Sequence, residues 1–171
     1  HGSDETREVL MKTAFLPRVS AALAEAVTGK SDAIEHIEDL YRRHLFTDRS
    51  VGGEITYQYH ALFRAFLKSK ASTEFSADTC HSIALRAAAA LQTEGHADLA
   101  FALFVEAGEW SGAEKIIIDS APQMLAQGRW RTIVQWVENL PSGRLDANPW
   151  LQYWLGRSTT FLDPVAARSV L

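Results

Sequence analysis

Apolar residues recur at helical spacing over the first 44 residues and predict three helices there. The first helix covers residues 7–15. The second begins at Val19, keeps its apolar residues on one face, and ends at Gly29, because glycine is a common residue just past a helix end. Ser31 or Asp32 caps the third helix. The N-terminal part of the chain is therefore expected to be helical.

A short stretch after these helices alternates apolar and polar residues instead. Ile55, Tyr57 and Tyr59 occupy every second position, which is the period of a β-strand with two different faces. An extended run that starts at Leu45 precedes it. Residues 50–53 include two glycines and have the composition of a turn. The pattern predicts two strands joined into a β hairpin.

Helical spacing resumes at Ala61, so helices lie on both sides of the predicted hairpin. A lone hairpin is marginally stable in water and needs such helices to cover it. Residues 70–77 are small and polar and predict a linker. We therefore predict a mainly α fold whose first domain is a small winged helix with a β hairpin at residues 7–70.

The rest of the chain, residues 75–171, has the pattern of short Ala-rich helices separated by Gly95, Gly108 and Gly128. Gly95 and Gly128 lie 128 − 95 = 33 residues apart, which is close to the period of helix-turn-helix repeats. Pro122 is expected to interrupt one of these helices. The pattern predicts an α-solenoid of tetratricopeptide-like helical pairs.

The apolar pattern continues to the end of the chain without a polar stretch that could cap a solenoid. Trp150, Leu151 and Trp154 are followed by Phe161 and Leu162. A repeat array needs a polar outer face at its end. The chain is therefore expected to be a piece of a longer protein, and its open end is expected to self-associate.

Composition narrows the function classes. The 171 residues are 47% hydrophobic and 22% charged, so the chain can bury a core. The net charge of −4 argues against a free-standing nucleic-acid binder. No apolar run approaches the roughly 18 residues that a membrane-spanning helix needs. The single cysteine, Cys80, excludes an internal disulfide and suits a cytoplasmic protein.

The candidate catalytic groups in the sequence are poorly placed for chemistry. The chain has no GxxxxGK[ST] phosphate loop. Cys80 and His81 are adjacent on a predicted helix and diverge by about 100°, so they cannot act as a nucleophile and its base. We therefore predict no catalytic residue and no enzyme activity for this chain.

Histidines and arginines before the hairpin have simpler explanations than a site. His36, Asp39 and His44 lack the spacing of a metal motif, and we predict no metal ligands. Basic residues favour helix C-termini, which accounts for the first two of the three arginines near the hairpin. A DNA-contacting wing is the alternative for this cluster, formed by Arg42, Arg43 and Arg49.

His60 is the strongest single candidate for a site residue. It ends the second predicted strand and precedes the helix that begins at Ala61. A helix N-terminus favours anions, and a histidine there can add a hydrogen-bond donor to a phosphate. The alternative is an interfacial histidine whose side chain only donates a hydrogen bond to a backbone carbonyl. The five tryptophans are expected mainly between helices, with one or two of them on a concave surface where a ligand or peptide docks: Trp110, Trp130, Trp136, Trp150 and Trp154.

Several stretches, taken in order, match a known family pattern. They are FLPRVSAALAEAVTG (15–29), LYRRHLFTDRSVGGEITYQYHALFRAFL (40–67), CHSIALRAAAALQTEGHADLAFALFVEAGEWSGAEKII (80–117), AQGRWRTIVQWVENLP (126–141) and NPWLQYW (148–154). This string resembles the MalT-like, LuxR-type transcriptional regulators within the signal-transduction ATPases with numerous domains. The family pattern often has a second histidine after the one at His60, and here that position is Ala61.

The resemblance implies an architecture and a role. It implies an ATPase domain before this segment, a winged helix, a superhelical sensor domain, and a C-terminal DNA-binding helix-turn-helix. It implies that His60 reaches the phosphates of ATP or ADP held by that ATPase domain, since the segment itself holds no cofactor. It further implies that the helical repeats bind an effector small molecule or protein, that DNA is bound only through the missing C-terminal domain, and that no membrane is a partner.

The sequence supports two functional hypotheses. The first is a regulatory segment that couples nucleotide state to effector or partner sensing in an ATP-dependent transcriptional regulator. The second is a stand-alone helical-repeat adaptor that binds other proteins. An open apolar groove with no surface for an ATPase contact would favour the second.

Overall fold

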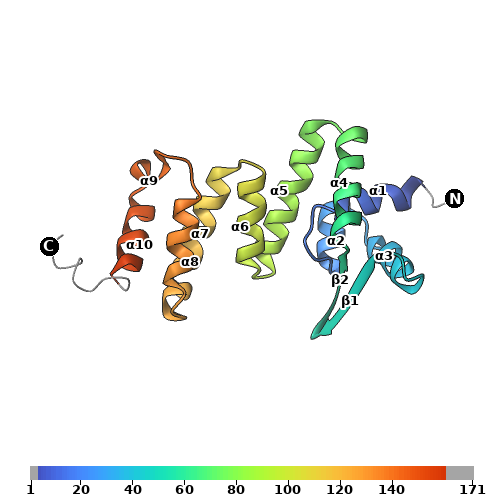
Figure 1. Cartoon of the computed structure of the whole chain (residues 1–171), viewed down its shortest axis with the longest axis horizontal. Coiled ribbons are helices and arrows are strands. Elements are labelled where there is room, and N and C mark those ends of the chain that lie inside the picture. The colour runs from blue at the N-terminus through green and yellow to red at the C-terminus, as the bar shows by residue number, and fades with distance from the viewer. Residues whose placement is uncertain (1–3, 161–171) are drawn as a thin grey trace. The chain divides into compact units, whose positions relative to one another are not determined.

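The structure, a computed structural model, describes residues 4–160 and divides the chain into two compact units (Figure 1). The N-terminal unit comprises residues 1–99 and the C-terminal unit residues 100–171. The first unit contains α1 (Asp4–Thr13), α2 (Ala21–Thr28), α3 (Ala33–Arg42), β1 (Thr47–Gly52), β2 (Glu54–Tyr59), α4 (Ala61–Glu74) and α5 (Ala77–Thr93). Helix α6 (Ala97–Glu106) crosses the boundary, and the second unit continues with α7 (Trp110–Ala126), α8 (Trp130–Glu138), α9 (Arg144–Ala147) and α10 (Pro149–Thr159).

The predicted hairpin is confirmed. β1 and β2 pair antiparallel, with Thr47 opposite Tyr59 and Gly52 opposite Glu54 (Figure 1). Gly53 turns the chain at φ 95°, a conformation that L-residues with a side chain rarely adopt. The turn is tighter than predicted, because residues 50 and 51 belong to β1.

The second strand joins the helices of the N-terminal unit to the hairpin. Tyr57 and Tyr59 are buried, while the residues between and before them on β2 are more exposed. Tyr57 exchanges two backbone hydrogen bonds of 2.8 Å with Val19. The hydroxyl of Tyr59 lies 2.7 Å from that of Thr13 at the end of α1. Strand β2 is thus fixed on one side by α1 and by the segment before α2.

The prediction that a helix begins at Val19 is wrong. Val19 forms an isolated bridge with Tyr57, and α2 begins at Ala21. The apolar spacing of this stretch fits a helix, but the backbone groups of Tyr57 need partners and Val19 supplies them. Ser20 then caps α2 by accepting a hydrogen bond from the Leu23 N–H. Gly29 ends the helix at φ 77°, as predicted.

The linker predicted at residues 70–77 is also wrong, because α4 continues to Glu74. Ala71 is fully buried, so the small residues of this stretch include part of the packed face of the helix. The hydroxyls of Ser72 and Thr73 donate to carbonyls one turn earlier. Phe75 and the cap residue Ser76 alone separate α4 from α5.

The C-terminal unit is a set of short helices. Helices α7, α8 and α10 contact one another. Pro122 lies inside α7 without interrupting it, contrary to expectation, and its side chain is exposed. The short helix α9 was not predicted. The prediction that residues 75–171 form a tetratricopeptide-like domain stays a prediction, and the expectation for Phe161 and Leu162 lies outside the described residues.

Aromatic and glycine residues set the spacing of helices in this unit. Trp136 stacks on Phe101 with ring centroids 4.5 Å apart and an interplanar angle of 10°. A Cβ atom at Gly112 would lie 2.5 Å from Cδ1 of Phe104. Because Phe104 is itself buried, its ring has little space to move away. Gly112 therefore allows α7 to approach the ring of Phe104 closely.

We expect Gly112→Ala to lower the free energy of unfolding by about 1–3 kcal/mol, the usual cost of overpacking. Urea denaturation followed by circular dichroism measures this. Gly156→Ala is the matched control, because Gly156 lies inside α10 and a Cβ there meets nothing within 4 Å. The control should be neutral or stabilising by about 0.5–1 kcal/mol. Equal effects of the two substitutions would contradict a steric role for Gly112.

Candidate functional site

His60 lies between β2 and α4, at the N-cap position of α4. Its backbone N–H donates to the carbonyl of Phe46 at 2.9 Å, and its carbonyl accepts from the N–H of Arg64 at 2.9 Å. Its side chain makes no capping hydrogen bond. Because Tyr59 points into the core, the next residue points outward, and the imidazole is exposed.

The imidazole has one carboxylate neighbour and one aromatic neighbour. Nε2 lies 3.4 Å from Oδ2 of Asp48 on β1. The ring of Phe46 meets the imidazole edge-on, with centroids 6.2 Å apart. Both partners of the His60–Asp48 contact are largely exposed, so the pair contributes little to stability. It orients the imidazole without burying it.

An exposed apolar surface surrounds His60. We call it the His60 patch and define it as Phe46, His60, Leu62, Phe63 and Phe66. The ring of Phe63 stacks on Phe46 at 5.4 Å and on Phe66 at 6.5 Å. Leu62 is 87% exposed and Phe46 is 55% exposed. Contiguous exposed apolar side chains of this kind mark surfaces that contact another molecule or domain.

The patch includes an open hollow of about 450 Å³, lined by four of its members and Ala61. The first turn of α4 contains no acidic residue. The free backbone N–H groups at the start of a helix, together with its dipole, favour anions. The hollow thus combines an apolar wall, an imidazole and a helix N-terminus without a competing carboxylate in its first turn.

Arg64 holds the start of α4 in place. Its Nε donates to the carbonyl of Ala14 at 2.8 Å, and its Nη2 donates to that of Phe15 at 3.1 Å. These carbonyls follow the end of α1, where backbone acceptors lack helical partners. The ring of Phe63 also meets Tyr59 edge-on at 5.7 Å. The backbone beneath His60 is therefore tied to the core of the unit.

A second hollow of about 780 Å³ lies among α1, α3 and α4, with Phe63 and Phe66 in its lining. Its cationic lining residues are already paired: Arg7 with Glu74, and Arg43 with Asp39 at 3.0 Å. The hollow continues from the His60 patch through its two shared phenylalanines.

The histidine and carboxylate groups that the sequence suggested as metal ligands are not brought together as a set. His36 does not group with Asp39 and His44. Among residues 4–160, the one set with the proximity of metal ligands is Glu5, Asp32 and His36, whose ligand atoms lie within 4.8 Å of one another. The sequence did not reveal it, because Glu5 comes from a different helix.

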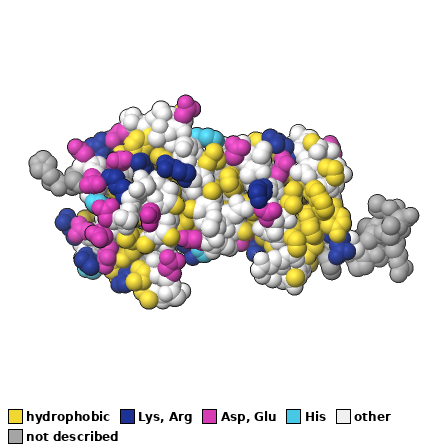
Figure 2. Space-filling model, turned by 180° about the vertical axis from the view of Figure 1, so that it is seen from behind, with side chains coloured by type: hydrophobic (Ala, Val, Ile, Leu, Met, Phe, Trp, Pro, Cys, Tyr) yellow, Lys and Arg dark blue, Asp and Glu magenta, His cyan; other side chains and the backbone are white. Residues whose placement is uncertain are grey.

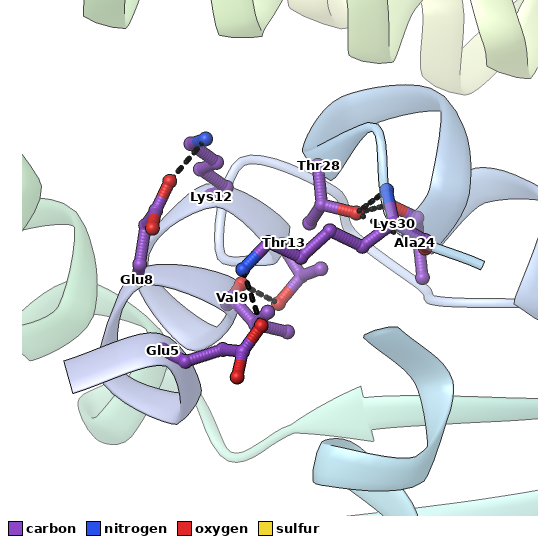
Figure 3. Close-up of polar contacts among 8 residues, drawn as sticks. All are labelled: Glu5, Glu8, Val9, Lys12, Thr13, Ala24, Thr28 and Lys30. Carbon is purple, nitrogen blue, oxygen red and sulfur yellow. Dashed lines mark hydrogen bonds and ion pairs between the residues drawn. The ribbon is translucent and has the colours of Figure 1, made fainter. Parts of the chain in front are cut away.

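A lysine already pairs with Glu5 of this group. Lys30 Nζ donates to Glu5 Oε1 at 2.7 Å, and this hydrogen bond holds the pKa of the Glu5 carboxyl below its ordinary value (Figure 3). Nδ1 of His36 lies 3.0 Å from the hydroxyl of Thr6. The neighbouring Lys12–Glu8 pair in Figure 3 is a similar helix surface contact of 2.5 Å. The cluster is thus a polar junction between α1 and the start of α3, in which Lys30 balances the charge of Glu5.

The remaining candidates have structural surroundings. The thiol of Cys80 is half-buried and lies 3.7 Å from the carbonyl of Ala71. The three arginines near the hairpin each have a protein partner: Arg42 pairs with Glu38, Arg43 with Asp39, and Arg49 lies over the ring of Tyr41. These contacts dilute the charge that a DNA-contacting wing needs.

The surface differs between the two units. Figure 2 shows acidic and basic side chains interspersed over the N-terminal unit and hydrophobic side chains gathered on the C-terminal unit. On α10, Trp150 is 60% exposed and its ring meets Tyr153 edge-on at 6.0 Å. The buried Nε1 of Trp154 has no hydrogen-bond partner among the described residues. Trp150 is therefore an exposed tryptophan rather than one packed between helices.

Within residues 4–160, no helix has the length and apolar character to cross a membrane.

Comparison with known proteins supplies the context for this geometry. Residues 1–79 match the sequence model of the MalT winged helix domain. The HTH-type transcriptional regulator MalT of Cronobacter sakazakii (strain ATCC BAA-894) is 29% identical over 158 residues, covering 91% of this chain. That of Klebsiella pneumoniae (strain 342) is 28% identical over 156 residues, covering 90%. The chain spans 17% of the length of each of these relatives.

The His60 patch is expected to be replaceable without loss of the fold. Leu62→Ala should change the free energy of unfolding by no more than about 0.5 kcal/mol, as is usual for surface positions. Leu67→Ala, on the buried side of the same helix, should cost about 2–5 kcal/mol. Chemical denaturation of both variants checks this. A large loss for Leu62→Ala would show that this residue is covered in solution.

Proposed function

We propose that this chain is a regulatory segment of an ATP-dependent transcriptional regulator, because residues 1–79 match the MalT winged helix domain and most of the chain is similar to MalT regulators. In this proposal, the winged helix reports the nucleotide state of an ATPase domain elsewhere in the same protein. The helical region receives an effector small molecule or a protein partner. The relatives are named transcriptional regulators, which supports this class of function.

The observation that carries the proposal is the exposed position of His60 at the start of α4. A phosphate placed before α4 would meet the free N–H groups of the first turn and the imidazole together. Asp48 Oδ2 lies 3.4 Å from Nε2 and orients the ring beside the start of α4, where an imidazole N–H can donate to a phosphate oxygen. His60 would therefore contact ADP or ATP that is held mainly by the ATPase domain.

The apolar part of the His60 patch supports the same arrangement. Phe46, Leu62 and Phe66 expose a surface that a neighbouring domain can cover. In this proposal, the ATPase domain elsewhere in the same protein is that neighbour. Its contact excludes water from the hollow beside His60, so that the hydrogen bond to phosphate is stronger than in open solvent.

Other parts of the function are assigned outside this segment. The segment holds no cofactor of its own and performs no catalysis in this proposal. DNA is bound through a C-terminal domain rather than through the hairpin, whose nearby arginines are engaged with Glu38, Asp39 and Tyr41. The regulator acts in the cytoplasm. The aromatic surface of α10, with Trp150 and Tyr153, is available for an effector or for the open-end self-association expected from sequence.

The same aromatic surface favours a second candidate function. A stand-alone helical-repeat adaptor would bind a protein partner through exposed rings such as Trp150 and Tyr153, because aromatic anchors dominate many protein interfaces. This adaptor would need neither nucleotide nor an ATPase domain. Pull-down of a partner that depends on α10 and is indifferent to His60 would favour it.

His60→Ala in a full-length regulator should weaken ADP retention about tenfold, the effect of losing one charge-assisted hydrogen bond. It should also raise basal transcription. Isothermal titration with ADP gives the affinity, and a reporter gene gives the basal activity. His81→Ala, at an exposed position on α5, is the matched control and should leave both unchanged. Unchanged ADP affinity of the His60 variant, together with a destabilised segment, would mean that His60 serves only packing.

The 171-residue chain alone should show no ATP turnover and little salt-sensitive binding to duplex DNA. A coupled phosphate-release assay and fluorescence anisotropy at two salt concentrations test these expectations. Hydrolysis that copurifies with the chain through several chromatographic steps would overturn the assignment of catalysis to another domain.

A further inference from the structure

A polar contact of long sequence separation joins α2 to the end of α5. The Ser20 hydroxyl donates to Oε1 of Glu94 at 3.1 Å across a separation of 74 residues. Oγ of Ser20 also accepts a hydrogen bond of 3.1 Å from the N–H of Leu23, and this bond caps α2. Ser20 is fully buried, and the Glu94 side chain is 22% exposed. The contact is therefore shielded from most of the solvent.

The negative charge of Glu94 is favourable near the N-terminus of α2 and unfavourable at the C-terminus of α5. Glu94 is the C-cap residue of α5, where the helix dipole disfavours an anion. The last turn of α5 contains no basic residue to compensate. In contrast, the first turn of α2 contains no acidic residue, and its N-terminus favours one. The carboxylate is thus well placed only while α5 lies against α2.

Apolar packing accompanies this contact. Helices α2 and α5 lie against each other within the N-terminal unit. Leu23 and Val27 on α2 are fully buried, as are Ile83 and Leu91 on α5. Nε2 of His96, two residues after Glu94, lies 3.7 Å from the second carboxylate oxygen. One carboxylate oxygen thus accepts the Ser20 hydrogen bond and the other faces the His96 ring, at the point where the chain leaves α5.

We propose that Ser20 and Glu94 form a latch that keeps α5 docked on the winged helix. The latch makes α5, which lies largely beyond the 1–79 match, move with the winged helix rather than with the helices that follow. Its role in coupling rests on the proposed function, since α5 then connects the nucleotide-sensing unit to the helical region. The latch itself requires neither nucleotide nor effector.

Amide hydrogen exchange on the 171-residue chain tests the latch, because the exchange rate in α5 changes in opposite directions with and without it. Glu94→Gln removes the charge while nearly conserving shape. Without a latch, this substitution removes an unfavourable charge from a helix C-terminus and slows exchange in α5. With the latch, it weakens docking and raises exchange of α5 amides on the order of tenfold. Glu94→Ala should raise it further, because the acceptor is lost as well.

Glu138→Gln is the matched control. Glu138 is exposed and ends α8, so it shares the unfavourable position at a helix C-terminus. Its replacement should leave exchange in α8 unchanged or slower. Amides of α1 and α4 serve as the internal reference in the Glu94 variants, because they report opening of the whole N-terminal unit.

Faster exchange in α5 alone, with α1 and α4 unchanged, supports the latch. Slower or unchanged exchange in α5 overturns it, and so does an equal rise throughout the N-terminal unit. The measurement contains no nucleotide, so a failed latch leaves the His60 proposal standing. Equally, an ADP affinity that is indifferent to His60 leaves the latch standing.

Discussion

The burial of Tyr57 and Tyr59 is the interaction on which the N-terminal unit depends. A two-stranded hairpin has too little apolar surface to be stable alone, so its strands persist because helices cover one face. Tyr57 is bonded through its backbone to Val19, and Tyr59 reaches the hydroxyl of Thr13 at 2.7 Å. Burial raises the pKa of the Tyr59 phenol, which keeps it neutral in the core. Strand β2 is thereby attached to both α1 and the entry to α2.

The position of the candidate site follows from that attachment. Since Tyr59 points inward, His60 points outward, and the chain turns there into α4. Arg64 bonds the carbonyls of Ala14 and Phe15 and thus fixes the same helix one turn later. The exposed rings beside His60 are therefore presented by a rigid backbone. In the proposed function, this rigidity suits the patch to report contact with another domain.

The errors of sequence reasoning share a physical origin. Val19 fits a helical face, but its backbone is taken by Tyr57. The small, polar residues after position 70 resemble a linker, yet Ala71 is small because it is buried. Pro122 is tolerated inside α7 on an exposed side of the helix. In each case a tertiary contact or a solvent-facing position outweighs a local preference. The hydrogen bond between Ser20 and Glu94 had no local signal in the sequence, because the two residues are 74 positions apart.

The sequence by itself determined the features that depend on near neighbours. Alternation predicted β2, the glycine-containing stretch at residues 50–53 predicted the turn, Gly29 ended α2, and the order of motifs indicated a MalT-like segment. It also placed His60 between strand and helix. Only the tertiary structure decided which side chains surround the imidazole of His60, which lysine pairs with Glu5, and that Glu94 contacts the N-cap of α2. Those outcomes depend on segments that are distant in sequence and are brought together by burial of the core, which no local pattern encodes.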